Sequence, residues 1–201
     1  MNIEIINKIL FFWFIFFVTP GPVWLAVMAT TNQQAAKDIV KFFFTVFLSV
    51  NLIIQVPQAI VSVVFVDIIT QLFSAAGYVF YFLGGAYILF MAAKSFKAGW
   101  TDSPLQLSFV NLLMIMLLSP KIWILFPSGA VIANQLNLGL MVNAGVYAFI
   151  MFSVSSILFY FYVLIGKIGQ KLLKDNFSYL VTFLLGIFAM FLFIQGFKLI
   201  L

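Results

Sequence analysis

One lysine in this sequence stands where a charge is costly. Lys121 follows Ser119 and Pro120 near the middle of the long apolar segment 107–133. A charged side chain at mid-depth in a bilayer costs about 2.5–3.5 kcal/mol, so it should face the protein interior and meet carbonyls, a polar side chain or an anion. Two uses stay open: binding a substrate carboxylate, or locking helices together through the carbonyls of a broken neighbouring helix.

A proline-rich motif interrupts another apolar segment, 9–30, at its middle: Thr19, Pro20, Gly21 and Pro22. Proline removes backbone donors and clashes with the preceding turn, and glycine permits unusual dihedral angles. We therefore expect a break or a kink here. If the helix breaks, its second half begins with unpaired N–H groups and a positive dipole end, which suit a carboxylate. A simple kink is the alternative.

Four polar residues share one helical face of segment 39–66, at spacings of 4, 3 and 4: Asn51, Gln55, Gln58 and Ser62. Amides facing lipid are costly, so this face is expected to line a cavity or to pack against a neighbour. Asn51 and Gln55, near mid-membrane, are candidate contacts for the polar part of a solute. Segment 138–165 has a polar counterpart, interpreted as interhelical hydrogen bonds: Ser153, Ser156 and Tyr160.

The elements that must position these residues follow from the composition. The 201 residues are 65% hydrophobic and 7% charged, against about 25% charged in an average soluble domain. So few charges could not cover a soluble core, so lipid must be the solvent. Six apolar segments are long enough to cross a bilayer, which takes about 20 residues each: 9–30, 39–66, 72–93, 107–133, 138–165 and 177–201.

The sequence therefore predicts an all-α fold, a polytopic membrane bundle of six transmembrane helices forming one domain over residues 1–201. The first segment is expected to stay as a helix, because its apolar run is longer than that of a signal peptide. There is no Cys and no His, and every basic residue is Lys. Disulfides, thiolate metal sites and histidine acid–base catalysis are excluded. We expect no catalytic residues, no cofactor and no metal.

The lysines also predict an orientation. They cluster in the first, third and fifth connections: Lys37, Lys41, Lys94, Lys97, Lys167, Lys171 and Lys174. The second and fourth connections contain none. Because lysine resists translocation, the odd connections should face the cytoplasm and both termini should lie outside. Lys8 and Lys198 are the two exceptions. The net charge of +5 thus reflects loops at the membrane and not nucleic-acid binding.

The two halves of the chain, about 1–100 and 101–201, resemble each other. Thr19-Pro20 matches Ser119-Pro120 at a distance of 100 positions. Four residues of the third segment match residues of the sixth at a distance of 101: Gly85, Phe90, Phe96 and Lys97 with Gly186, Phe191, Phe197 and Lys198. Because three spans separate the copies, the second half would enter the membrane from the opposite side. Two inverted three-helix repeats are typical of secondary transporters.

Short motifs along nearly the whole chain resemble the LysE-type amino-acid exporter family, which includes lysine, threonine and homoserine exporters. They occur in order as Pro20-Gly21-Pro22, Gly84-Gly85-Ala86-Tyr87-Ile88-Leu89, Asn111-Leu112 with Ser119-Pro120-Lys121, Phe126-Pro127 and Gly196-Phe197-Lys198-Leu199. The chain departs from the family in having Ser119 for Asn, no Gly between 34 and 55, and Asn51 near an expected Asp.

The resemblance implies export of amino acids or related metabolites across the bacterial cytoplasmic (inner) membrane, driven by a proton or ion gradient. A small amino-acid-like solute and membrane lipids would be the partners, and a homo-oligomer is open. Our hypothesis is that breaks at Pro20–Pro22 and at Pro120 meet near the midplane, where their exposed N–H groups and Lys121 would attract the substrate carboxylate. Three alternatives stay open: an exporter of an inorganic ion, a small intramembrane enzyme, and a non-transporting assembly factor.

Overall fold

A computed structural model describes residues 2–100, 107–174 and 176–200, and among these the chain forms helices and connections without a strand. The predicted all-α class is therefore confirmed. Lower-case eta marks π-helical stretches. The elements are α1 (Ile3–Val18), α2 (Pro22–Thr31), α3 (Ala36–Phe42), η1 (Phe43–Phe47), α4 (Leu48–Val50), η2 (Asn51–Gln55), α5 (Val56–Val64), α6 (Val66–Trp100), α7 (Phe109–Leu117), α8 (Pro120–Asn134), α9 (Leu140–Leu173) and α10 (Asn176–Lys198).

Four helical stretches are long and apolar enough to cross a membrane: Ala36–Val64, Val66–Lys97, Leu140–Leu173 and Asn176–Lys198. Two further pairs pass the same criterion only when joined, and each pair is sharply bent. The bend is 62° between α1 and α2 and 60° between α7 and α8. The described residues thus hold four candidate spans, or up to six if each bent pair counts as one span.

The boundaries depart from the predicted segments at one connection. Residues 67–71 were expected to join the second and third spans, but α6 begins at Val66 and only Phe65 separates it from α5. Asp67 lies in the first turn of α6, where a carboxylate is stabilised by the helix dipole. A helix can therefore start directly on this residue. The last residue of the sixth predicted span, Leu201, and the join between the predicted repeats near residue 101 lie outside the described residues.

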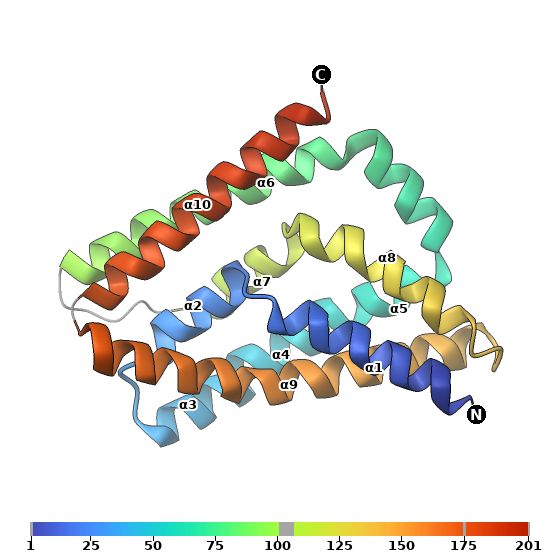
Figure 1. Cartoon of the computed structure of the whole chain (residues 1–201), viewed down its shortest axis with the longest axis horizontal. Coiled ribbons are helices and arrows are strands. Elements are labelled where there is room, and N and C mark those ends of the chain that lie inside the picture. Colours follow the sequence, from blue (N-terminus) through green and yellow to red (C-terminus); the bar gives the residue numbers. More distant parts are fainter. Residues whose placement is uncertain (1, 101–106, 175, 201) are drawn as a thin grey trace.

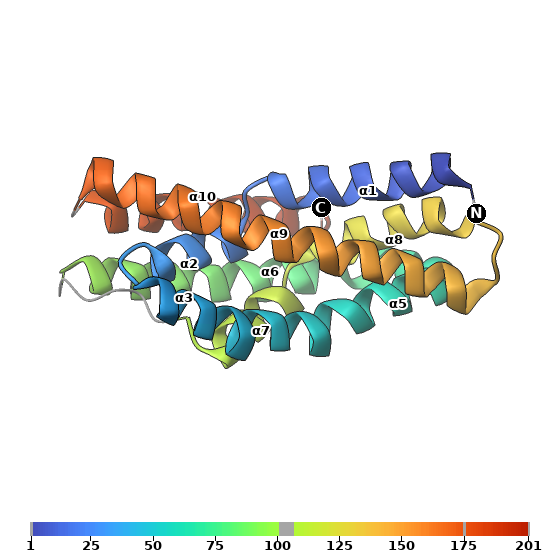
Figure 2. The same ribbon diagram turned by 90° about the horizontal axis from the view of Figure 1, so that it is seen from below.

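Helices α6 and α10 form a closely packed pair that flanks the rest of the molecule (Figures 1 and 2). Small residues permit the close approach. A Cβ on Gly85 of α6 would lie 3.3 Å from the Phe193 ring of α10, and one on Gly196 would lie 3.2 Å from Tyr81 and from Phe82. On the other side, α9 packs against α5, α2 and α1. The two bent pairs lie between these layers.

The connections that carry most of the lysines lie at one end of the molecule. In Figure 1 the α2–α3 connection, the end of α6 and the end of α9 lie together at one end of the molecule. These are the segments that carry the lysines of the odd connections, such as Lys37 and Lys171. The N-terminus and the α8–α9 connection lie toward the opposite end. This arrangement is the one that the alternating charge pattern requires.

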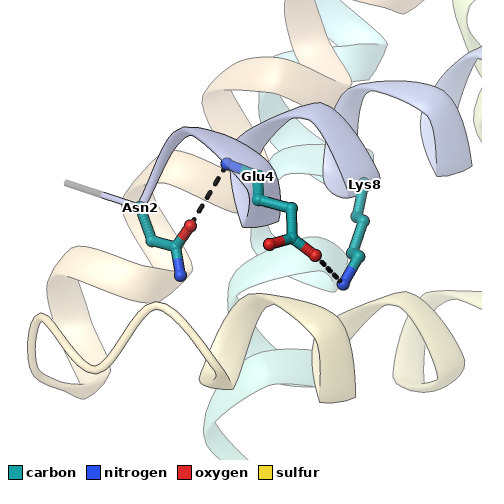
Figure 3. Close-up of polar contacts among 3 residues, drawn as sticks. All are labelled: Asn2, Glu4 and Lys8. Carbon is teal, nitrogen blue, oxygen red and sulfur yellow. Dashed lines mark hydrogen bonds and ion pairs between the residues drawn. The ribbon is translucent and has the colours of Figure 1, made fainter.

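Lys8, one of the two exceptions to that pattern, is paired within its own helix (Figure 3). Its Nζ lies 2.6 Å from Oε1 of Glu4, one turn earlier. Asn2 caps the same helix by accepting a hydrogen bond from the Glu4 N–H at 3.2 Å, which is why α1 begins at Ile3. The pairing offsets the positive charge of Lys8, so this lysine weighs little in the orientation of the chain.

Candidate functional site

The first bent pair breaks at the proline motif. Helix α1 ends at Val18, Thr19 is its C-cap, and α2 restarts at Pro22. Proline at the first position of a helix loses nothing, because that N–H has no intrahelical acceptor. Gly21, however, has φ −146° and ψ 178°, an extended conformation open to any residue. The break therefore forms without an unusual dihedral angle at this glycine.

The second bent pair breaks in the same manner 100 positions later. Helix α7 ends at Leu117, and Pro120 is the first residue of α8 with Ser119 as its N-cap. Downstream, α8 continues through Pro127 without a second break. The Tyr147 hydroxyl of α9 donates a hydrogen bond of 2.8 Å to the Phe126 carbonyl, which supports the helix beside that proline.

Side chains from other helices satisfy the carbonyls that the first break exposes. The Lys121 ammonium donates to the Phe16 carbonyl at 2.7 Å and to the Thr19 carbonyl at 3.2 Å, and it lies 4.4 Å from the centre of the Phe16 ring. The Tyr162 hydroxyl contacts the two carbonyls in between, at 3.2 and 2.8 Å. A cation at the negative end of a helix dipole is favourable. In this conformation Lys121 makes the interhelical contacts that a locking role requires.

The starts of α2 and α8, unlike the ends of α1 and α7, lack side-chain hydrogen-bond partners among the described residues. Neither Gly21 nor Ser119, the N-caps of α2 and α8, makes a side-chain capping hydrogen bond. At the end of α7, by contrast, the indole N–H of Trp123 donates to the Leu117 carbonyl at 2.7 Å. Both breaks thus have at least one carbonyl paired with a side chain, while the first-turn N–H groups of both second halves have no capping side chain. Two positive dipole ends result.

These two helix starts line one partly open cavity of about 40 Å³. Its wall includes residues of the first break, residues of the second and one buried amide: Gly21, Pro22, Val23 and Trp24, then Ser119, Lys121 and Ile122, and Gln55. At about 10–15 Å³ for each water, this volume holds a few water molecules and no amino acid. Residues of both breaks thus border one small space, whose wall is mostly apolar.

Two larger cavities adjoin the same residues. One, of about 270 Å³, lies between the breaks and the α6–α10 pair; its polar end is formed by Ser119 and Lys121. The remainder of its wall is largely apolar: Tyr81, Ile88, Ile124, Leu125, Phe188, Phe191 and Leu192. The other, of about 470 Å³, lies between α1 and α8 and includes Thr19. Lys121 lines all three cavities, so it stands where they converge.

The polar face of segment 39–66 is buried as a whole: Asn51, Gln55, Gln58 and Ser62. Asn51 and Gln55 stand at the two ends of η2, a widened turn next to Pro57, whose missing N–H prevents regular pairing. Asn51, 0% exposed, packs against α9 and accepts a hydrogen bond of 3.4 Å from the Ser155 hydroxyl. Gln55 reaches the cavity, where its Oε1 has no partner among the described residues.

Of the nine predicted site residues, seven line these cavities: Thr19, Gly21, Pro22, Gln55, Ser119, Pro120 and Lys121. Pro20 belongs to the first break but lines none of them. Asn51 does not line these cavities. It is held by its own helix, through the Phe47 carbonyl at 3.2 Å, and by α9. A direct role for Asn51 in binding solute is not supported by this conformation.

The predicted polar face of the fifth segment is wrong. Ser153 and Ser156 donate to carbonyls of their own helix, at 2.8 Å each, and Tyr160 is 41% exposed. The inward residues are Ser155 and Tyr162. The sequence holds a weak signal for Tyr162, since it lies seven residues from Ser155 on the same helical face.

Among the described residues no group of His, Cys, Asp or Glu side chains could hold a metal ion. Comparison with protein-family models, with curated proteins and with solved structures finds no match to this chain.

Proposed function

We propose that this protein is a secondary-active exporter of amino acids or closely related small metabolites, of the LysE type, in the bacterial cytoplasmic (inner) membrane. Six spans would form two inverted three-helix repeats. The substrate carboxylate binds where the two broken helices restart, and Lys121 supplies the matching positive charge. A proton or ion gradient drives the export, and the chain works as a monomer or a homo-oligomer.

One observation carries the proposal: two uncapped helix starts and one lysine converge on a single cavity. Backbone N–H groups at a helix start bind anions, and discontinuous membrane helices use them in this way near the midplane. An inorganic cation would be repelled by the Lys121 ammonium. An intramembrane enzyme would need a general base or metal beside the cavity, and the lining residues include neither a carboxylate nor a histidine.

Two features of the fold support an inverted repeat. Each half has a bent pair followed by two long helical stretches, and the bends differ by only 2° (62° and 60°). The third stretches of the two halves, α6 and α10, pack against each other, as do α5 and α9 from the second stretches. Such pairing of equivalent elements is expected when a pseudo-two-fold axis relates two halves of a transporter.

The cavity volumes fit a closed state of such a transporter. About 40 Å³ at the helix starts admits water, and the adjoining 270 Å³ approaches the range of about 300–1,000 Å³ typical of small-molecule sites. On binding, Lys121 would exchange the Phe16 and Thr19 carbonyls for the substrate carboxylate. That exchange frees the end of α1 and links occupancy of the site to movement of the broken helix.

Efflux from proteoliposomes loaded with a mixture of amino acids tests the proposal. The wild-type protein should release one or more of them faster than protein-free liposomes do. Lys121→Gln should lower the rate at least tenfold, whereas Lys198→Gln, at the exposed end of α10, should leave it within about twofold. No release by the wild type, or equal release by the Lys121 variant, would contradict it.

A further inference from the structure

Two buried glutamines of the η2–α5 stretch have amide atoms without a hydrogen-bond partner. Gln55, 3% exposed, leaves its Oε1 unpaired, and Gln58, 7% exposed, leaves both Oε1 and Nε2 unpaired among the described residues. Buried amides in native proteins are almost always paired, with protein groups or with ordered water. Since no described protein group supplies the partners, water is the remaining candidate.

These amides are part of a continuous polar row. Gln55, Gln58 and Ser62 follow one another along one helical face, with rises of about 4.5 and 6 Å at 1.5 Å per residue. The row begins at the cavity between the breaks, which Gln55 lines. At its far end the Val63 carbonyl accepts a hydrogen bond of 3.4 Å from Asn134, whose own Oδ1 also has no partner in the described part of the chain.

The row leads toward a defined side of the molecule. Helices α5 and α8 pack together and run toward the same end, where α8 ends at Asn134 and connects to α9 (Figure 1). This end is opposite the one that carries the lysines of the odd connections. No charged residue belongs to the row, so a solute or an ion would meet neutral amides and hydroxyls that both donate and accept.

We propose that Gln55, Gln58, Ser62 and Asn134 mark a narrow water-filled path from the cavity at the helix breaks to the end of the molecule where α8 meets α9. In the exporter proposed above, this path is the outer half of the route that the solute takes; only that reading rests on the proposed function. In the conformation described here the path admits water. Its neutral walls hold a departing solute weakly, which favours release.

The absence of native cysteine allows a direct test with single-cysteine variants. Gln58→Cys and Ser62→Cys sit on the path, and Val61→Cys, 40% exposed on the outside of the same helix, faces lipid. Methyl methanethiosulfonate, a small uncharged reagent, reacts with a thiolate, which forms only in contact with water. In proteoliposomes, modification measured by mass spectrometry should be at least tenfold faster at positions 58 and 62 than at position 61.

Equal rates at the three positions would overturn the path. Ser62→Cys only replaces the side-chain oxygen by sulfur. This variant therefore suffices for the test if Gln58→Cys does not elute as a single folded species. The labelling requires no transport, so the two proposals fail separately. Rapid labelling with efflux independent of Lys121 would refute the substrate site alone, while slow labelling with efflux dependent on Lys121 would refute the path alone.

Discussion

Lys121 and Tyr162 perform one structural task from two different helices. The end of α1 exposes carbonyls at the first break, and between them these two side chains contact the carbonyls of Phe16, Phe17, Val18 and Thr19. Because lipid offers no hydrogen bonds, a break in a membrane helix persists only if such partners exist. If Lys121 binds substrate as proposed, the stability of the break and the binding of substrate depend on the same lysine.

Removing the Tyr162 hydroxyl should weaken the break without disturbing the packing around it. Tyr162→Phe keeps the ring stacked on Trp24, at 4.6 Å between ring centres, but leaves the Val18 carbonyl unpaired. We expect a loss of about 1 kcal/mol in the free energy of unfolding, measured by denaturant titration in detergent. Tyr160→Phe is the control, since that hydroxyl makes no hydrogen bond with the described residues. Equal stability of the two variants would contradict the capping role.

A substitution at Gly21 can test the function of the first break without changing the stability of the fold. Its backbone is extended and a Cβ would meet no atom within 4 Å, so Gly21→Ala should fold with unchanged stability. The added methyl group would, however, enter the space that Gly21 lines at the helix starts. We expect a rise of several-fold in the substrate concentration for half-maximal efflux. Gly186→Ala, which is equally open but lies within α10, should leave this concentration unchanged.

At the scale of elements, α6 packs directly against the second break. A Cβ on Gly84 would lie 2.5 Å from the Leu118 carbonyl oxygen and 3.3 Å from Pro120. Only a glycine permits this approach, so α6 lies directly on the point where α7 ends. The glycine pair at 84–85 thus packs one residue against the break and the other against α10.

Gly84→Ala should therefore destabilise the protein although alanine is the better helix former. Forcing a methyl group against a backbone oxygen costs typically 1–3 kcal/mol, more than the gain in helix propensity of about 1 kcal/mol. Thermal unfolding in detergent should show a lower midpoint than the wild type. Gly186→Ala, in open space on α10, should show an unchanged or higher one. The reverse order would mean that α6 is not seated on the break.

The sequence predicts a feature of these elements when neighbouring residues cause it, and fails when contacts between distant segments cause it. Both breaks follow from proline itself, and both were expected. The start of α6 at Val66 and the inward face of α9 were not. Ser153, Ser155 and Ser156 are alike in sequence, and only the approach of Asn51 singles out Ser155. Tyr162 is similarly defined by the carbonyls of α1, about 144 residues away in the chain.

At the scale of the whole molecule, the two ends differ both in their charge and in their hydrogen bonding. At the lysine-bearing end, Lys167 donates to the Gln34 carbonyl at 3.0 Å and Asn32 donates to Gln170 at 2.9 Å, which ties the α2–α3 connection to α9. Toward the other end runs the row of unpaired amides. A transporter closed on one side and hydrated toward the other would have this asymmetry.

The orientation can be tested with the cysteine-free chain. Lys37→Cys lies in α3 at the lysine-bearing end and Gln135→Cys lies at the end of α8, both exposed. In intact cells an impermeant thiol reagent should label position 135 and should reach position 37 only after permeabilisation, because positive connections stay in the cytoplasm. The opposite labelling would place both termini inside.

The most direct measurement compares an amino acid with its carboxamide, which lacks the negative charge. If the helix starts and Lys121 bind the carboxylate, wild-type proteoliposomes should export the amino acid at least tenfold faster than its amide. In Lys121→Gln this ratio should fall several-fold toward one, because the positive charge that would bind the carboxylate is removed. A ratio near one in the wild type, or the same ratio in both proteins, would contradict carboxylate binding at the breaks.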